Sequence, residues 1–267
     1  MQRPPAVAGQ FYPDQADQLR RLVERLLVSA EPEQSALGVM SPHAGYLYSG
    51  TIAGATFAGV KAPKTAVILG PNHHGLGHPA AVFASGSWLT PLGETAINRQ
   101  LADRILRECP GVASDVLAHR YEHSLEVQLP FLQLRSPELS IVPICLSYAP
   151  LPQLLALGEA LGALLAETGD DVLVVASSDM THYEPGETAR GKDMRAIERI
   201  LALDPEGVYQ TVREGRISMC GVVPVVVMLA AARRRGAVRA KLVHYGNSGE
   251  ITGDQSEVVG YAGVIVA

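Results

Sequence analysis

The chain has few cysteines, few aromatic residues and no excess of basic residues. Its 267 residues include 3 cysteines, and 22 Lys and Arg stand against 27 Asp and Glu. The formal net charge of -5 argues against a nucleic-acid partner, because phosphate binding requires clustered Lys and Arg. An odd, widely separated set of cysteines does not form a disulfide framework, so at least one thiol requires another explanation.

Long apolar runs and an N-terminal targeting segment are also missing. No apolar run reaches the roughly 20 residues that cross a bilayer, so we expect no membrane partner. Residues 1–12 lack the charged-then-apolar layout of a signal peptide, which predicts a cytoplasmic protein. Hydrophobic residues make up 47% and charged residues 18% of the chain, a composition typical of soluble globular proteins.

Apolar runs alternate with amphipathic stretches along the whole chain, and no linker or internal repeat divides it. The apolar runs predict strands at 36–41, 65–70, 140–147 and 171–177, and near 238–245 and 258–266. The amphipathic stretches predict helices at 15–29, 98–108, 124–134, 151–167, 190–203, 205–214 and 222–234. Pro143 weakens a central position for the strand 140–147. The alternation predicts one α/β domain over residues 1–267, with a central, mostly parallel sheet flanked by helices.

Histidines follow three of the predicted strands. His43 follows the strand 36–41, His73 and His74 follow 65–70, and His182 follows 171–177 together with Asp179. In open α/β sheets, ligands bind beyond the carboxyl ends of the strands. A single histidine is more often structural, but the convergence of three strand ends indicates a site at this edge.

Two further polar segments precede predicted helices. Cys220 lies just before the helix 222–234, where the helix dipole is expected to lower the pKa of the thiol and to favour the metal-binding thiolate. The alternative is a buried, inert cysteine. Glu122 and His123 lie ahead of the helix 124–134, in a loop expected to face the strand ends, and a helix N-terminus alone explains Glu126.

Several segments, in this order, resemble the Memo family, also called AmmeMemoRadiSam system protein B. They are AGQFYP at 8–13, SPHAGYLYSG at 41–50, ILGPNHHG at 68–75, EHSLEVQLPF at 122–131, SSDMTHY at 177–183, CGVVPV at 220–225, and Tyr261-Ala262-Gly263. The resemblance covers essentially the whole chain. It implies a fold similar to that of class III extradiol dioxygenases, which hold Fe(II) with two histidines and a carboxylate.

The resemblance also implies a mononuclear site with two histidines and one cysteine. Carried onto this sequence, the metal ligands are His43, His73 and Cys220, and His73 is preferred over His74 through the family motif alone. The residues expected to act as catalytic or neighbouring polar groups are His182, His123, Asp179 and Glu126. A thiolate takes the place of the oxygenase carboxylate, which distinguishes this ligand set from that of the extradiol dioxygenases.

Fe(II) is the favoured ion, and Cu or Zn would also suit two imidazoles and a thiolate. The leading hypothesis is a non-haem metalloprotein with a redox, dioxygenase-like role, without proof of turnover. The alternatives are a non-catalytic protein that binds metal, a peptide or a small ligand, and a zinc hydrolase. The family name links microbial members to a radical SAM protein and an AMMECR-type protein, which implies a shared pathway but identifies no small-molecule or peptide ligand.

Overall fold

Four parallel strands form the middle of the sheet. They lie in the order β8 (Ser140–Leu146), β3 (Thr65–Pro71), β9 (Val172–Ser177) and β2 (Gly38–Ser41). In this computed structural model, which describes residues 1–168 and 171–267, every residue of these strands except Ser140 is buried. Helices cover both faces, so each strand consists almost entirely of apolar residues, as the sequence predicts.

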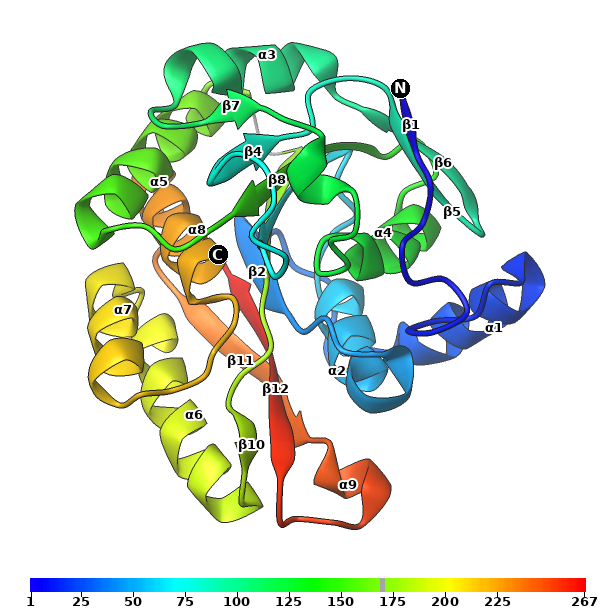
Figure 1. Cartoon of the computed structure of the whole chain (residues 1–267), viewed down its shortest axis with the longest axis vertical. Coiled ribbons are helices and arrows are strands. Elements are labelled where there is room, and N and C mark those ends of the chain that lie inside the picture. The colour runs from blue at the N-terminus through cyan, green and yellow to red at the C-terminus, as the bar shows by residue number, and fades with distance from the viewer. Residues whose placement is uncertain (169–170) are drawn as a thin grey trace.

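Shorter and antiparallel strands extend the sheet on both sides (Figure 1). Beyond β8 lie β6 (Gly93–Ile97), β5 (Ser87–Thr90) and β1 (Gln2–Arg3), and β4 (Ala80–Val82) pairs with β8 and with β7 (Ala113–Ser114). Beyond β2 lies β12 (Val258–Val266), which pairs antiparallel with β2, with β11 (Ala240–Asn247) and with β10 (His182–Glu184). The sheet is therefore parallel at its centre and mixed at its edges.

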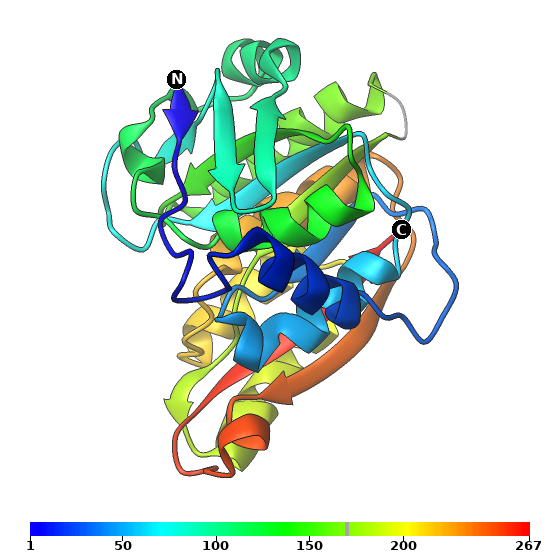
Figure 2. The ribbon, with the colours of Figure 1, turned by 90° about the vertical axis from the view of Figure 1, so that its right-hand side faces the viewer.

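Helices cover the two faces of this sheet (Figures 1 and 2). On one face, α8 (Val222–Arg234) packs against β2, β3 and β9, with α5 (Leu151–Ala166) and α7 (Pro205–Glu214) against it. On the other, α2 (Tyr46–Ala58) packs against β2, β11 and β12, and contacts α1 (Ala16–Leu26) and α4 (Leu129–Arg135). The remaining helices are α3 (Arg99–Glu108), α6 (Gly186–Leu201), α9 (Gly249–Thr252) and the 3-10 turns Leu117–His119 and Glu126–Gln128.

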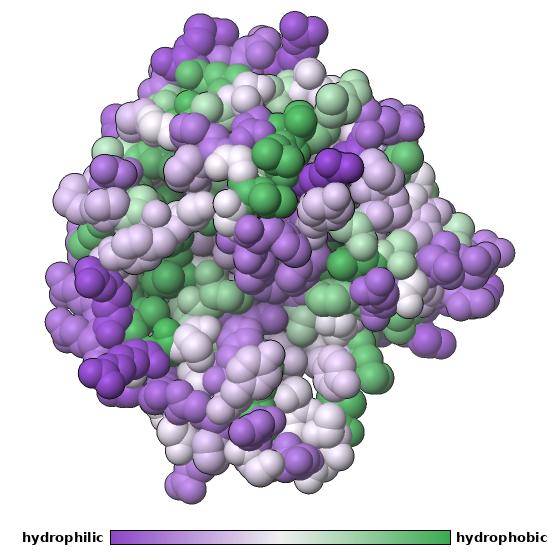
Figure 3. Space-filling view, in the orientation of Figure 1, coloured by the Kyte–Doolittle hydropathy of each residue, from purple (hydrophilic) through white to green (hydrophobic). Residues whose placement is uncertain are grey.

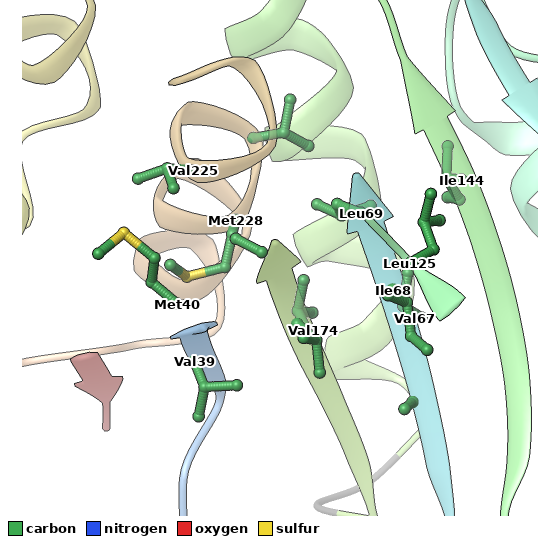
Figure 4. Close-up of a cluster of buried hydrophobic side chains, with 14 of the residues drawn as sticks. Val39, Met40, Val67, Ile68, Leu69, Leu125, Ile144, Val174, Val225 and Met228 are labelled. Carbon is green, nitrogen blue, oxygen red and sulfur yellow. The ribbon is translucent and has the colours of Figure 1, made fainter. Parts of the chain in front are cut away.

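The core lies between the central strands and α8 (Figure 4). Met40 of β2 and Val174 of β9 lie on the side of the sheet that faces Met228 of α8, whereas Val39 points to the other side, and all four side chains are buried. On the face seen in Figure 3, hydrophilic and apolar residues are interspersed. Within the described residues, no helix is long and apolar enough to cross a membrane.

Pro143 does lie inside the sheet, because its strand changes neighbours at that point. β8 pairs with β6 through Ser140 and Ile141, and with β4 from Ile144 onward. Between these two stretches, the carbonyl oxygen of Pro143 accepts a hydrogen bond from the N–H of Phe83. The missing N–H of the proline therefore falls in a gap of the ladder, where it interrupts no regular pairing.

The sequence-based assignment misses the helix α2. Its sequence, YLYSGTIAGATFA, is apolar around most of its circumference, and nine of its residues are buried. Amphipathic periodicity is therefore weak, because α2 is covered on several sides. The predicted helix 124–134 differs at its start: α4 begins only at Leu129, after a 3-10 turn, since Pro130 lacks an N–H and suits a first helical turn.

Candidate metal centre

Three adjacent strand ends carry the polar groups of the candidate site. His43 follows β2 after one proline, His73 follows β3 after one asparagine, and Asp179 follows β9 after one serine. Because β2 pairs with β9 and β9 pairs with β3, all three parallel strands end at the same edge. The sheet therefore brings together side chains that lie far apart in the sequence.

A group of three histidines is the centre of this site. Among the described residues, one ring nitrogen each from His43, His73 and His123 lies within 4.8 Å of the others, close enough for the three to hold one metal ion. The rings of His43 and His73 meet edge to face at 5.2 Å, whereas those of His73 and His123 stack at 4.8 Å. His43 is 2% exposed, His73 29% and His123 20%, so the group is reachable from one side.

Glu122 orients His73. One carboxylate oxygen of Glu122 lies 2.9 Å from His73 Nδ1, and the other accepts the backbone N–H of His73 at 2.7 Å. Burial acts to raise the pKa of Glu122, but these hydrogen bonds, the His73 charge and the N–H of Ser124 hold it far below its ordinary value. An ionised carboxylate only accepts, so His73 carries a proton on Nδ1 and directs its Nε2 away from Glu122. In the sequence, the position of Glu122 in a loop ahead of a helix indicated that it would face the strand ends. It did not indicate that Glu122 would contact His73.

His43 is held in a similar way. Its Nδ1 lies 2.9 Å from the Ser177 hydroxyl, and its backbone N–H donates to the Asp179 carboxylate at 2.7 Å. Its Nε2 lies 3.2 Å from the sulfur of Cys220. Burial first and the neighbouring His73 second lower the pKa of His43 to about 3, so the ring is neutral at physiological pH.

Cys220 lies beside His43, and its thiol is protonated in the metal-free protein. The pKa of Cys220 is raised well above its usual value, first because the group is buried and second because the Asp179 carboxylate is close. The expectation of a lowered pKa at a helix N-terminus is therefore wrong, since burial and a neighbouring carboxylate outweigh the helix dipole. Cys109 and Cys145 are buried within the fold, and burial raises the pKa of both thiols, as expected for inert cysteines.

Asp179 and His182 lie next to the histidine group. Burial raises the pKa of Asp179 above its usual range, although the N–H of His43 and the positive potential of His182 and His123 oppose that shift. His182 Nδ1 lies 2.7 Å from the Met180 carbonyl oxygen and 3.0 Å from that of Ser218. Both neighbours only accept, so His182 carries a proton on Nδ1.

His123 is held mainly by ring packing. Its ring lies 4.8 Å from that of Phe11 and 5.5 Å from that of His43, in addition to the stacked His73. Burial lowers the pKa of His123 to about 4, helped by the adjacent His43, so this ring is also neutral at physiological pH. A neutral imidazole beside the other two can act as a ligand or as an acid–base group.

Glu126 contacts the N-terminal segment instead of the histidines. Its buried carboxylate pairs with Arg3 at 2.7 Å and accepts hydrogen bonds from the N–H groups of Ala6 and Val7 and from the Tyr12 hydroxyl. These contacts give Glu126 a structural task, and its expected catalytic role stays a prediction.

His74 lies outside the three-histidine group. It is exposed, and its Nε2 lies 3.0 Å from the Tyr121 carbonyl oxygen. Neighbouring residues at a strand end point in different directions, so only the structure separates His73 from His74.

The chemistry of these donors fits a metal ion. His43 and His73 each make a hydrogen bond through Nδ1, and one ring nitrogen of each lies within 4.8 Å of the other. The sulfur of Cys220 lies next to Nε2 of His43. Metal-binding histidines typically use one nitrogen for the ion and the other for an orienting carboxylate, carbonyl or hydroxyl group. The residues present therefore suit a site with imidazole and thiolate ligands.

Known proteins of one family are similar to this chain over nearly its whole length. The family model described as Memo-like protein matches residues 3–265. A MEMO1 family protein of Methanosarcina barkeri is 43% identical over 266 residues, which cover 99% of both chains. MEMO1 family proteins of Methanopyrus kandleri and Aquifex aeolicus are 42% and 43% identical, covering 99% and 98% of this chain and the same shares of their own lengths.

A solved structure shares the fold. The crystal structure of an uncharacterized protein from Escherichia coli K12 superposes with a TM-score of 0.56 and 16% sequence identity, and the match covers 85% of this chain and 98% of the other. At this level of identity, the likeness concerns the architecture alone.

Proposed function

Because the chain belongs to the Memo-like protein family, we propose that it is a metalloprotein whose single ion is held by His43, His73 and Cys220. The observation that carries the proposal is the contact of an oriented imidazole with a thiol: His43 Nε2 lies 3.2 Å from Cys220 Sγ, and one ring nitrogen of His43 lies within 4.8 Å of one of His73. Three protein ligands leave open coordination positions, which suit a reactive site more than a structural one.

Cys220 is a better third ligand than His123 on two grounds. The lone pair of an imidazole nitrogen lies in the ring plane, and the stacked planes of His73 and His123 differ by only 15°. Such rings direct their lone pairs toward one point less readily than the edge-to-face pair of His43 and His73, whose planes differ by 77°. A thiolate also brings a negative charge that offsets part of the charge of a divalent cation.

The role that we propose is that of a non-haem, dioxygenase-like oxidoreductase, with Fe(II) favoured and Cu or Zn as alternatives. When bound, the ion supplies a redox and Lewis-acid centre with open positions. His182, whose Nδ1 faces two carbonyl oxygens, and the neutral His123 can accept or return a proton beside it. Asp179 holds the backbone of His43 in place through its 2.7 Å hydrogen bond.

The setting of this activity is part of the same proposal. We expect a cytoplasmic protein that takes a small-molecule or peptide ligand and that shares a pathway with a radical SAM protein and an AMMECR-type protein.

A zinc hydrolase is the second candidate function, and one observation favours it. The three histidines His43, His73 and His123 form a donor set by themselves. Three histidines and a water molecule are a known ligand set of catalytic zinc, which makes hydroxide available at neutral pH. In that case Cys220 would be a neighbour of the site and not a ligand.

Metal analysis of anaerobically purified variants tests both candidates. We expect about one metal ion per chain in the wild type and in the matched control His74→Ala, and strong loss in His73→Ala and Cys220→Ser, because each of the latter removes one of three ligands. Oxygen consumption by the iron-loaded wild type would support the oxidoreductase role.

Two outcomes would redirect the proposal. Unchanged metal content in His73→Ala would show that the metal site does not lie at this edge of the sheet. Loss of metal in His123→Ala with full retention in Cys220→Ser would establish the three-histidine site and favour the zinc hydrolase.

A further inference from the structure

A buried hydrogen-bond network lies behind His43, on the side of the ring that faces away from Cys220. The Ser177 hydroxyl oxygen lies 2.9 Å from His43 Nδ1, 2.6 Å from the Ser124 carbonyl oxygen and 2.8 Å from Gln128 Nε2. Ser124, Gln128 and Ser177 are 0% exposed, so bulk water does not compete for these contacts. The proposed metal site does not itself use Ser124 or Gln128.

The direction of each hydrogen bond follows from what the groups can donate. The Ser124 carbonyl oxygen only accepts, so the 2.6 Å contact requires the single proton of the Ser177 hydroxyl. The hydroxyl oxygen then has two lone pairs left, and it accepts from both other neighbours. One of these is the Gln128 amide N–H, and the other must be a proton on His43 Nδ1.

The orientation of the Gln128 amide supports this assignment. Its Nε2 also lies 3.0 Å from the Pro42 carbonyl oxygen, which accepts but cannot donate. Rotating the amide by 180° would place two oxygens against each other and would give Ser177 a second acceptor that its one proton cannot satisfy. Gln128 Oε1 has no hydrogen-bond partner among the described residues, so contacts of the nitrogen alone determine the orientation.

We infer that Ser177 is a positioning residue that, held by Gln128 and the Ser124 carbonyl, fixes His43 as the Nδ1–H tautomer and leaves its Nε2 lone pair free. The opposite tautomer would direct the Nδ1 lone pair at Ser177 and would require the hydroxyl proton that the Ser124 carbonyl holds. It would also place a proton on Nε2, the nitrogen that faces Cys220. The consequence for metal binding rests on the proposed function, whereas the tautomer itself does not.

Nitrogen-15 NMR of the metal-free protein at neutral pH tests the tautomer directly. Two-bond proton–nitrogen correlations distinguish Nδ1–H from Nε2–H, and a His43→Gln sample identifies the His43 signals among the 8 histidines of the chain. We expect Nδ1–H in the wild type. In Ser177→Ala, which removes the acceptor, we expect a mixture of tautomers or Nε2–H. Ser177→Thr, which keeps the hydroxyl group, should retain the wild-type signal.

Ser41→Ala is the matched control. Ser41 is also a buried serine at the end of a strand, two residues before His43, but its hydroxyl oxygen has no hydrogen-bond partner within the described chain. This variant should leave the tautomer and the zinc affinity unchanged, whereas Ser177→Ala should lower zinc affinity about 10- to 100-fold, as is typical for groups that orient metal ligands. If Ser177→Ala does not fold, Ser177→Cys replaces it, because sulfur is a weak acceptor of similar size.

The two possible failures can be told apart. An Nε2–H signal for His43 in the wild type, or an unchanged Nδ1–H signal in the folded Ser177 variant, would overturn the inference about Ser177. A wild-type protein that shows the Nδ1–H tautomer but binds no metal would instead contradict the proposed function and leave the role of Ser177 standing.

Discussion

Burial keeps the imidazoles of His43 and His123 neutral and keeps the proton on the thiol of Cys220. The pKa of His43 is lowered to about 3 and that of His123 to about 4, in both cases mainly by burial. In Cys220, burial and the Asp179 carboxylate raise the pKa of the thiol, so the sulfur stays protonated. A metal ion that binds the thiolate must therefore displace a proton from sulfur.

Metal affinity should rise with pH because of Cys220. With one proton released on binding, apparent affinity increases by about tenfold per pH unit while the thiol of the metal-free protein stays protonated. His43 is neutral throughout pH 6–8 and adds no slope. Competition titrations with zinc over that range measure the effect.

Two variants at position 220 complete this test. Cys220→Ser should bind more weakly and with a smaller slope, and Cys220→Asp should recover part of the affinity and shift the preference toward Fe(II), because carboxylates suit harder ions. An equal slope in wild type and Cys220→Ser would show that the thiol is not a ligand.

At the scale of elements, the N-terminal segment is attached to the fold by one buried carboxylate. Glu126 receives the Arg3 guanidinium, two backbone N–H groups and the Tyr12 hydroxyl, and Arg3 is itself only 4% exposed. The guanidinium also lies over the ring of Trp88 and donates to the carbonyl oxygens of His119 and Glu122. The segment therefore contacts the loop that carries the site histidine His123.

Glu126→Gln should destabilise the protein without removing its metal. It leaves Arg3 buried without a counter-charge, and breaking such a pair costs about 3–5 kcal/mol. Urea unfolding and limited proteolysis of the N-terminus measure the loss. Glu108→Gln, which breaks an exposed pair with Arg104, is the matched control and should cost less than about 1 kcal/mol. A Glu126 variant of wild-type stability that has lost only turnover would support the catalytic role.

Helices α1 and α2 meet at a glycine. A methyl group at Gly54 would lie 2.2 Å from the Leu26 carbonyl oxygen, which belongs to the backbone and cannot rotate away. Gly54→Ala should therefore destabilise the protein by about 1–3 kcal/mol, the usual cost of overpacking. Gly191 in α6 is the control, because an added methyl group there meets no atom within 4 Å. Gly191→Ala should be neutral or stabilising by up to about 1 kcal/mol, and equal effects in thermal melts would refute the close approach.

For the molecule as a whole, a buried histidine outside the three-histidine group couples folding to pH. Burial lowers the pKa of His119 to about 4, and its Nε2 donates to the Ala81 carbonyl oxygen. Since the folded-state pKa lies below the unfolded value of about 6.5, the unfolded chain binds more protons in this interval. The contribution of His119 to stability is therefore present above about pH 6.5 and is lost as the pH falls toward 4.

His119→Gln should remove this dependence, because an amide can donate the same hydrogen bond but does not titrate. We expect wild type to lose on the order of 1 kcal/mol per pH unit relative to the variant between about pH 6.5 and 4. Urea unfolding at several pH values measures the difference between the two proteins, in which the opposite contributions of the buried Asp179 and Asp193 cancel. A difference in unfolding free energy that stays constant with pH would contradict the prediction.

The same unfolding curves test the single domain expected for residues 1–267. Two separate unfolding transitions would contradict it.

Apolar patterning along the sequence predicts the strands β2, β3, β8 and β9 and most helices, because burial on one or two faces imposes that pattern directly. The sequence also placed His43, His73 and Asp179 at one edge, since parallel strands share the direction of their ends. The α2 helix was not predicted, because a helix that is covered on several sides has no clear amphipathic pattern.

What each polar side chain contacts depends on the way distant segments fold together. Backbone direction at a strand end separates the clustered His73 from the exposed His74, and packing determines that Glu122 orients a histidine whereas Glu126 attaches the N-terminus. The pKa of Cys220 depends on burial and on Asp179, which lies 41 residues away in sequence. Such contacts are decided by groups from distant segments, and no local pattern of residues encodes them.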